Sequence, residues 1–77
     1  MSFSNEIKRI RQSSFLSQEA FARDLNVSFS SVNRWESGKS KPNLNAMKSI
    51  KEFCATHKID FSTIEKEWLK PKTEENK

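Results

Sequence analysis

The stretch that decides the fold is residues 17–38, SQEAFARDLNVSFSSVNRWESG. Ser17 and Ser28 are favoured at the N-cap of a helix, and each opens a run with apolar residues at helical spacing. Asn26 separates the two runs, and asparagine tolerates the left-handed conformation that ends a helix and turns the chain sharply. Gly38 comes directly after the second run, where a helix end favours a positive φ. The stretch therefore predicts two short helices joined by a tight turn.

Two helices that meet across such a turn need apolar side chains at fixed positions, because those side chains fill the junction between them. Counted from Gln18 as the first position, positions 4, 8, 10, 15 and 18 are Phe21, Leu25, Val27, Val32 and Trp35. Position 5 must be small because the helices nearly touch there, and it is Ala22. Position 9 must accept the angles of the turn, and it is Asn26. Agreement at all seven positions predicts a helix-turn-helix over residues 17–37, with its second helix over residues 28–37.

Three further helices are predicted outside this motif. The first runs from about Ser4, its N-cap, to Gln12, and Asn43 caps the fourth. The fifth opens with a capping box, in which Ser62 is the N-cap and Glu65 lies three residues later. The apolar faces of these three helices are Phe3, Ile7 and Ile10, then Leu44, Met47, Ile50, Phe53 and Cys54, and finally Phe61, Ile64, Trp68 and Leu69.

The composition predicts one all-α domain over residues 1–70, because one glycine and two prolines are too few for the turns of a β-rich fold. Residues 71–77 begin with a helix-stopping proline and are polar, so we expect a disordered tail. Cys54 is the single cysteine and His57 the single histidine, so we expect no metal and no cofactor. With no apolar run long enough for a bilayer and no signal-peptide pattern, we expect a cytoplasmic protein without membrane contact.

Positive charge is concentrated in the first three-quarters of the chain. The net charge is +4; residues 1–58 carry ten Lys or Arg against five Asp or Glu, and residues 59–77 carry four against five. A basic surface attracts polyanions, because the phosphates that it neutralises release their condensed counterions. Charge alone leaves two interpretations open, a nucleic-acid-binding domain and a basic domain that is merely soluble.

The chain resembles the Cro/phage-repressor (Xre-type) helix-turn-helix family. The residues that carry the resemblance are Leu16-Ser17-Gln18-Glu19-Ala20-Phe21-Ala22, Val27-Ser28, Val32-Asn33-Arg34-Trp35-Glu36-Ser37-Gly38-Lys39 and Pro42. The resemblance covers about residues 5–57 and, more loosely, the last helix. One departure is Asn26, because family members favour glycine there. The resemblance implies a compact bundle of five short helices, like the DNA-binding domain of the lambda repressor, that binds double-stranded DNA.

The resemblance also implies which side chains meet the DNA. Those that face the major groove are Ser28, Phe29, Ser30, Asn33 and Arg34. Gln18 matches a family residue that hydrogen-bonds a DNA phosphate, and Arg11 and Glu36 match a structural ion pair. The loop that lies along the DNA backbone in the family has here Lys39, Lys41 and Asn43.

The chemistry of these side chains suits the same roles. Arg34 can bond guanine O6 and N7, Asn33 can bond adenine N6 and N7, and Phe29 can cover a thymine methyl. Other interpretations remain open for some of them. Phe29 could be a core residue, Arg34 could contact phosphate or only solvent, and Lys39 and Lys41 could be ordinary loop lysines.

The sequence thus favours a sequence-specific, repressor-like transcriptional regulator, with a homodimer on an inverted DNA repeat as a possible assembly. The alternative is a DNA-targeting or protein-interaction module, such as an antitoxin or a restriction–modification controller, that docks through the acidic last helix. Trp68 and Leu69 fit either a cover for the core or an apolar edge for a second subunit. An enzyme is excluded, because the chain has no nucleophile–base pair, no paired acids and no phosphate-binding glycine loop, and no small-molecule substrate is expected.

Overall fold

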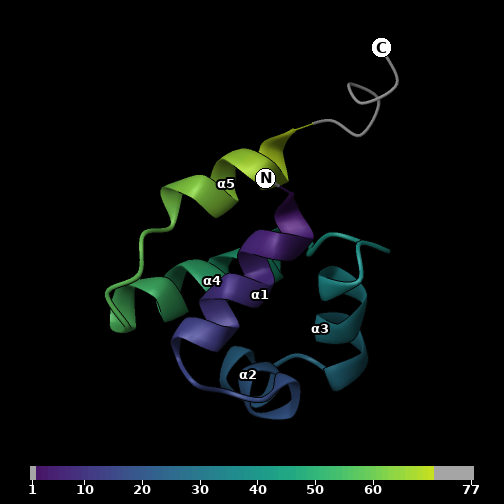
Figure 1. The fold of residues 1–77 in the computed structure, drawn as a ribbon, viewed down its shortest axis with the longest axis vertical. Helices are drawn as coiled ribbons and strands as arrows, with labels where there is room; N and C mark the ends of the chain where they lie inside the picture. Colours follow the sequence, from purple (N-terminus) through teal and green to yellow (C-terminus); the bar gives the residue numbers. More distant parts are fainter. Residues whose placement is uncertain (1, 71–77) are drawn as a thin grey trace.

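The computed structural model describes residues 2–70, which form five α-helices and no strand (Figure 1). The helices are α1 (Phe3–Ser13), α2 (Gln18–Leu25), α3 (Phe29–Glu36), α4 (Leu44–Thr56) and α5 (Ser62–Leu69). The predicted all-α fold of five short helices is therefore confirmed. The predicted tail, residues 71–77, lies outside the described residues.

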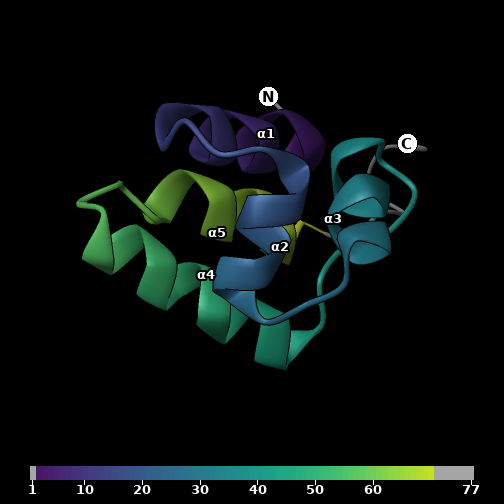
Figure 2. The same cartoon turned by 90° about the horizontal axis from the view of Figure 1, so that it is seen from below.

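The helices pack in a way that separates the two ends of the bundle. α1 contacts α3 and α5, and α2 contacts α3 and α4. In Figure 1, α2 lies at one end of the long axis and α5 at the other, with α1 and α4 between them. Figure 2, seen from below, places α2 in front of α5 and α3 along one side of the molecule. The predicted helix-turn-helix, α2 and α3, therefore packs on a different part of the core from α5.

One hydrophobic core joins all five helices. Its buried apolar residues are Phe3, Ile7, Ile10, Phe21, Ala22, Leu25, Val32, Trp35, Ala46, Met47, Ile50, Phe53, Cys54 and Ile64. The rings of Phe21 and Phe53 meet edge to face, with their centroids 5.0 Å apart, which ties α2 to α4. The predicted residues of the α2–α3 junction are buried as expected, and Val27 is half-buried against the same core.

Side-chain caps begin four of the five helices. In each case a side-chain oxygen accepts the backbone N–H of the residue three positions further along. The caps confirmed from the sequence are Ser17, Ser28 and Asn43.

The predicted cap of α1, Ser4, is wrong. Ser2 Oγ accepts the N–H of Asn5 at 3.2 Å, and the helix begins at Phe3. A start at this position places Phe3 inside the helix, four residues before Ile7 and on the same buried face. Burial of the phenylalanine therefore decides between two serines that are equally good caps.

The predicted capping box of α5 is also wrong. The N-cap position is Phe61, which has no side-chain cap, and Ser62 is the first helical residue. Asp60 Oδ1 accepts the backbone N–H of Ser62 at 3.0 Å and its hydroxyl at 2.8 Å. These bonds lower the pKa of Asp60, the backbone bond having the larger effect. Asp60 thus takes the N–H of Ser62 that Glu65 would accept in a capping box, and the N–H of Glu65 donates to Phe61 O instead of to the Ser62 hydroxyl.

Two leucines that the periodicity assigns to buried faces are exposed. Leu44, the first residue of α4, is 66% exposed, and Leu69, the last residue of α5, is 63% exposed. Both lie at helix ends. Between α4 and α5 they border an apolar groove of about 150 Å³, which Met47, Phe61 and Trp68 also line. We call it the α4–α5 groove.

Candidate nucleic-acid interface

A three-residue turn sets the angle between α2 and α3. Asn26 has φ 60° and ψ 42°, the left-handed conformation predicted for it, and its N–H bonds back to the end of α2. Val27 N–H donates to Ala22 O at 2.9 Å, which closes the turn over the small residue at the helix junction. The asparagine therefore fills the role that glycine usually has, at the cost of a conformation that few other side chains tolerate.

The outer side of α3 collects the residues predicted to face the major groove. Burial of Val32, Trp35 and Glu36 fixes which side of α3 points inward. On the opposite side, the five predicted groove residues are all exposed: Ser28, Phe29, Ser30, Asn33 and Arg34. Phe29 is 49% exposed, so about half of the residue's surface remains available for contact with another molecule.

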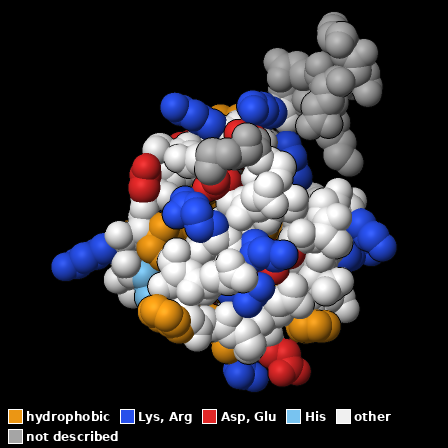
Figure 3. All heavy atoms as spheres, in the orientation of Figure 1, with side chains coloured by type: hydrophobic (Ala, Val, Ile, Leu, Met, Phe, Trp, Pro, Cys, Tyr) orange, Lys and Arg blue, Asp and Glu red, His pale blue; other side chains and the backbone are white. Residues whose placement is uncertain are grey.

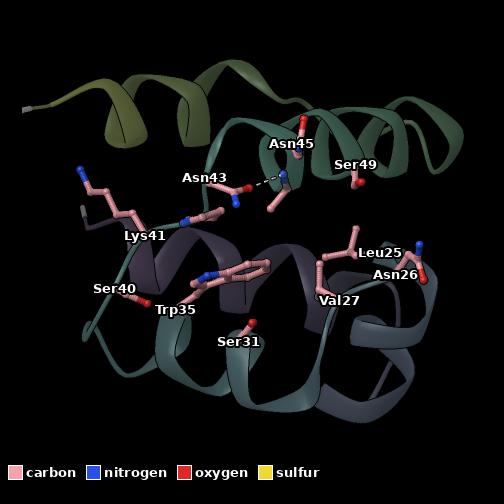
Figure 4. Close-up of a pocket in the computed structure, with 12 residues that line it drawn as sticks. Leu25, Asn26, Val27, Ser31, Trp35, Ser40, Lys41, Asn43, Asn45 and Ser49 are labelled. Atoms are coloured by element: carbon pink, nitrogen blue, oxygen red, sulfur yellow. Dashed lines mark hydrogen bonds between the residues drawn. The ribbon is translucent and has the colours of Figure 1, made fainter.

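Beside this surface, a polar groove of about 510 Å³ separates α3 from the start of α4 (Figure 4). Ser31 and Trp35 line it from α3, and Asn45 and Ser49 line it from α4. Ser31 is half-buried, whereas its neighbour Ser30 is exposed. The groove thus leaves the outer side of α3 clear of α4.

A buried carboxylate ties α3 to both preceding helices. Glu36 Oε2 accepts Arg11 Nε–H at 2.6 Å, and Glu36 Oε1 accepts Arg11 Nη2–H at 2.9 Å and Gln18 Nε2–H at 3.0 Å. Gln18 Oε1 in turn accepts Asn33 Nδ2–H at 3.3 Å. We call Arg11, Glu36, Gln18 and Asn33 the α3 clamp, because they fix α3 against α1 and α2.

The electrostatics of the α3 clamp favour a permanent ion pair. The hydrogen bond to Glu36 raises the pKa of Arg11, and this outweighs the opposing effect of partial burial. The third guanidinium nitrogen is used as well, since Arg11 Nη1–H bonds Leu16 O at 2.9 Å. The Arg11–Glu36 pair is thus a fixed structural joint close to the exposed residues of α3.

The loop between α3 and α4 holds the last three predicted site residues, and their side chains do different things. Gly38 begins the loop with φ 79°, the positive value expected of it. Lys39 is exposed, and Asn43 Oδ1 caps α4 by accepting Ala46 N–H at 2.9 Å. Lys41 instead points toward α5 (Figure 4), where its ammonium bonds the carbonyls of the last turn. Lys41 is therefore not gathered with the other predicted contacts.

Basic side chains are spread over the face seen in Figure 3, with fewer acidic ones among them. None of the helices in residues 2–70 is long and apolar enough to cross a membrane. In the same part of the chain, no three His, Cys, Asp or Glu side chains gather into a group that could hold a metal ion. Cys54 is buried, and burial raises the pKa of its thiol to about 11.

Some features of this structure have no signal in the sequence. Glu6 is 1% exposed and accepts Arg9 Nη2–H at 2.8 Å, and the residue type alone does not indicate a buried position. Phe15 is 94% exposed and has φ 59°, in the corner between α1 and α2. The bonds of Lys41 join residues about 26 positions apart, and no local pattern indicates them.

Comparisons with known proteins agree with this geometry. The profile of a family described as helix-turn-helix matches residues 7–58, which include α2, α3 and α4 but not α5. The HTH-type transcriptional activator BcrR of Enterococcus faecalis is 38% identical over 53 residues, which are 69% of this chain and 26% of that protein. The chain thus spans about a quarter of the length of this relative. No solved structure matches the chain significantly.

Proposed function

The chain belongs to the helix-turn-helix family of Cro/phage-repressor (Xre) type, and on that premise we propose that it regulates transcription by placing α3 in the major groove of a specific DNA site. One observation carries the proposal. A polar outer face of α3, with Arg34 near its end, faces solvent while the α3 clamp fixes the helix against α1 and α2 through the buried Glu36. Weak helix formers such as serine and asparagine occupy that face, so local helix stability does not account for them.

The donors left free on α3 determine the contacts that we propose. Arg34 makes no side-chain hydrogen bond within residues 2–70, so its whole guanidinium is available for guanine O6 and N7. Asn33 gives one amide hydrogen to Gln18 and keeps its second hydrogen and its oxygen for adenine. Phe29 would cover a thymine methyl, while Ser28 and Ser30 would adapt to neighbouring bases.

Contacts with the DNA backbone would come from both sides of α3. Gln18 keeps a second amide hydrogen for a phosphate, next to the free N–H groups that begin α2. Lys39 and the amide nitrogen of Asn43 would meet the backbone from the loop. These contacts would orient the domain, and the bases would supply the sequence preference.

We further propose a homodimer in which two copies meet at the α4–α5 groove. Each copy has two exposed leucines, Leu44 and Leu69, at the border of an apolar hollow of about 150 Å³. A two-fold axis at this surface lets the leucines of one copy enter the hollow of the other. Lys48 and Lys51 border the groove from α4 and Glu65 borders it from α5, so the same axis brings opposite charges together. None of these residues belongs to the proposed DNA contacts, which leaves both surfaces usable at once.

The direction of regulation depends on where the DNA site lies, because a bound domain can cover a promoter or present a surface to other proteins. The relative BcrR is named as an activator, whereas the resemblance to phage repressors indicates repression. The proposed contact of α3 with DNA would be the same in an activator and in a repressor. A cytoplasmic location, where chromosomal DNA is accessible, is part of the proposal.

Selection of bound sites from random duplex DNA tests the function directly. We expect a single preferred motif, and an inverted repeat with half-sites about one helical turn apart if the dimer forms. Arg34→Ala should then weaken binding to that motif by roughly 1–3 kcal/mol, or about 5- to 150-fold in Kd. Arg23→Ala is the matched control, since Arg23 is an exposed arginine of α2 outside the proposed contacts.

Two outcomes would contradict the proposal. One is binding that shows no preferred motif and does not weaken as salt rises. The other is an equal effect of Arg34→Ala and Arg23→Ala on the preferred site. Sedimentation of Leu44→Asp beside Phe15→Asp, which alters an exposed aromatic residue far from the groove, tests the dimer separately. Only the first of these variants should be monomeric.

A further inference from the structure

Four hydrogen bonds join the loop between α3 and α4 to the end of α5. Lys41 Nζ donates to the backbone oxygens of Glu67 at 3.0 Å, Trp68 at 3.3 Å and Lys70 at 2.9 Å. The indole Nε1–H of Trp68 donates to Pro42 O at 2.7 Å, in the opposite direction. We call these four bonds the loop–α5 latch.

The loop–α5 latch pairs the free carbonyls at the end of α5 with the N–H donors of the Lys41 ammonium group. The last carbonyls of a helix have no partner within the helix, and the negative end of the helix dipole favours a cation. An ammonium group has three N–H donors, and all three of those on Lys41 have an acceptor here. A lysine held in this way has no donor left for a phosphate.

The loop–α5 latch acts on the segment that carries two proposed backbone contacts. Pro42 is buried, and it lies directly before Asn43, whose side chain caps α4. Lys39 lies two residues before Lys41 on the same loop, after the positive φ of Gly38. Backbone bonds from Gly38 and Lys39 hold the start of the loop to the end of α3, and the loop–α5 latch holds its second half at Lys41 and Pro42. The family profile ends at residue 58, so α5 is an addition to the matched region.

We propose that Lys41 and Trp68 are positioning residues, which hold the loop in the shape that lets Lys39 and Asn43 meet the DNA backbone, and that Lys41 itself makes no phosphate contact. This inference rests on the proposed DNA binding and reassigns one residue of the loop. The helix outside the family match would thus contribute to DNA affinity without touching DNA.

The salt dependence of DNA binding separates a positioning role from a phosphate contact. A phosphate contact that is lost directly lowers the slope of log K against log salt by about 0.9, and a displaced loop also lowers the slope because Lys39 loses its phosphate. The two roles of Lys41 therefore differ in a background that already lacks Lys39. We expect Lys41→Met and Trp68→Phe each to weaken binding to the selected site by about three- to tenfold, the effect of losing a few hydrogen bonds. In the Lys39→Met background, Lys41→Met should change the slope no more than Lys66→Met, a control that removes an exposed charge from α5. Lys39→Met should lower the slope by about 0.9.

A measurement without DNA accompanies this comparison. Amide hydrogen exchange of residues 38–43 should be faster in Trp68→Phe, which keeps an aromatic ring but loses the indole N–H and part of the ring surface, than in the wild-type chain. Melting temperatures of all variants confirm that each is folded.

The results distinguish the possible failures. If Lys41→Met lowers the salt slope as Lys39→Met does, while Trp68→Phe leaves affinity and loop exchange unchanged, Lys41 contacts a phosphate and the inference is overturned. If the wild-type chain binds no duplex at any salt concentration, the proposed function is wrong and the inference is overturned with it. Weaker binding by both single variants, with no further change of slope when Lys41→Met is added to Lys39→Met, supports the loop–α5 latch.

Discussion

Arg11→Met is the substitution that tests the α3 clamp most directly. Methionine has nearly the length of the arginine stem but no charge, so the change removes two hydrogen bonds to Glu36 and one to Leu16 O. Gln18 is then the remaining side-chain donor to a carboxylate whose side chain is 2% exposed. The variant thus leaves a negative charge inside the protein without its counter-charge.

The expected cost follows from that burial. Breaking a buried ion pair by removing one partner costs about 3–5 kcal/mol, because the other charge remains desolvated. A small domain has only about 5–15 kcal/mol of stability in total, and each 1 kcal/mol shifts the melting temperature of a domain this size by about 4–8 °C. We therefore expect Arg11→Met to lower the melting temperature by at least roughly 12 °C.

Urea denaturation followed by circular dichroism gives the free energy of unfolding for a set of four proteins. They are the wild-type chain, Arg11→Met, Glu36→Leu and the double variant. The double variant should recover most of the loss, because replacing a whole buried ion pair by apolar side chains is often neutral or stabilising. Lys70→Met is the control, since Lys70 pairs with Glu67 at the surface, and such pairs contribute about 0–1 kcal/mol. A loss in Arg11→Met no larger than that of Lys70→Met would refute the reasoning.

Four further predictions concern single positions. Ala22→Leu should cost about 1–3 kcal/mol or more in urea denaturation, since Ala22 is 3% exposed where α2 meets α3; an unchanged midpoint would contradict the packing. Phe15→Gly should raise the free energy of unfolding by about 1 kcal/mol, because Phe15 buries little surface and its φ of 59° suits glycine. Asn26→Ala should lower the free energy of unfolding by about 1–2 kcal/mol, because alanine is strained at the φ of 60° that Asn26 has. Cys54, with a thiol pKa of about 11 and no exposure, should react with iodoacetamide near neutral pH only after urea unfolds the chain; fast labelling of the folded protein would disagree.

The sequence predicts the α2–α3 pair well because its geometry depends on neighbours close along the chain. Phe21, Leu25, Val32 and Trp35 repeat at spacings that place them on facing sides of two helices, and all four are buried. Asn26 could be identified as the turn because few residues accept its conformation. Where a residue type and a local spacing decide the outcome, the prediction holds.

The errors arise where the outcome depends on distant packing or on competition between neighbours. Leu44 lies in phase with the core residues of α4, yet α5 packs mainly on α1 and leaves this leucine uncovered. Asp60 takes the backbone N–H of Ser62 that Glu65 would accept in a capping box, and the nearer carboxylate prevails. Lys41 finds its acceptors on a helix that begins twenty-one residues later, which no local pattern can indicate.

Some residues of α3 bond the scaffold and others only face outward, and this difference matters for anyone who wishes to redirect the domain to a new DNA sequence. Ser28 caps the helix and Asn33 bonds Gln18, so a graft that replaces them disturbs the scaffold. Phe29, Ser30 and Arg34 make no side-chain hydrogen bond within residues 2–70, and all three face outward. A library randomised at these three positions alone would explore new specificities while every member retains the parent's architecture.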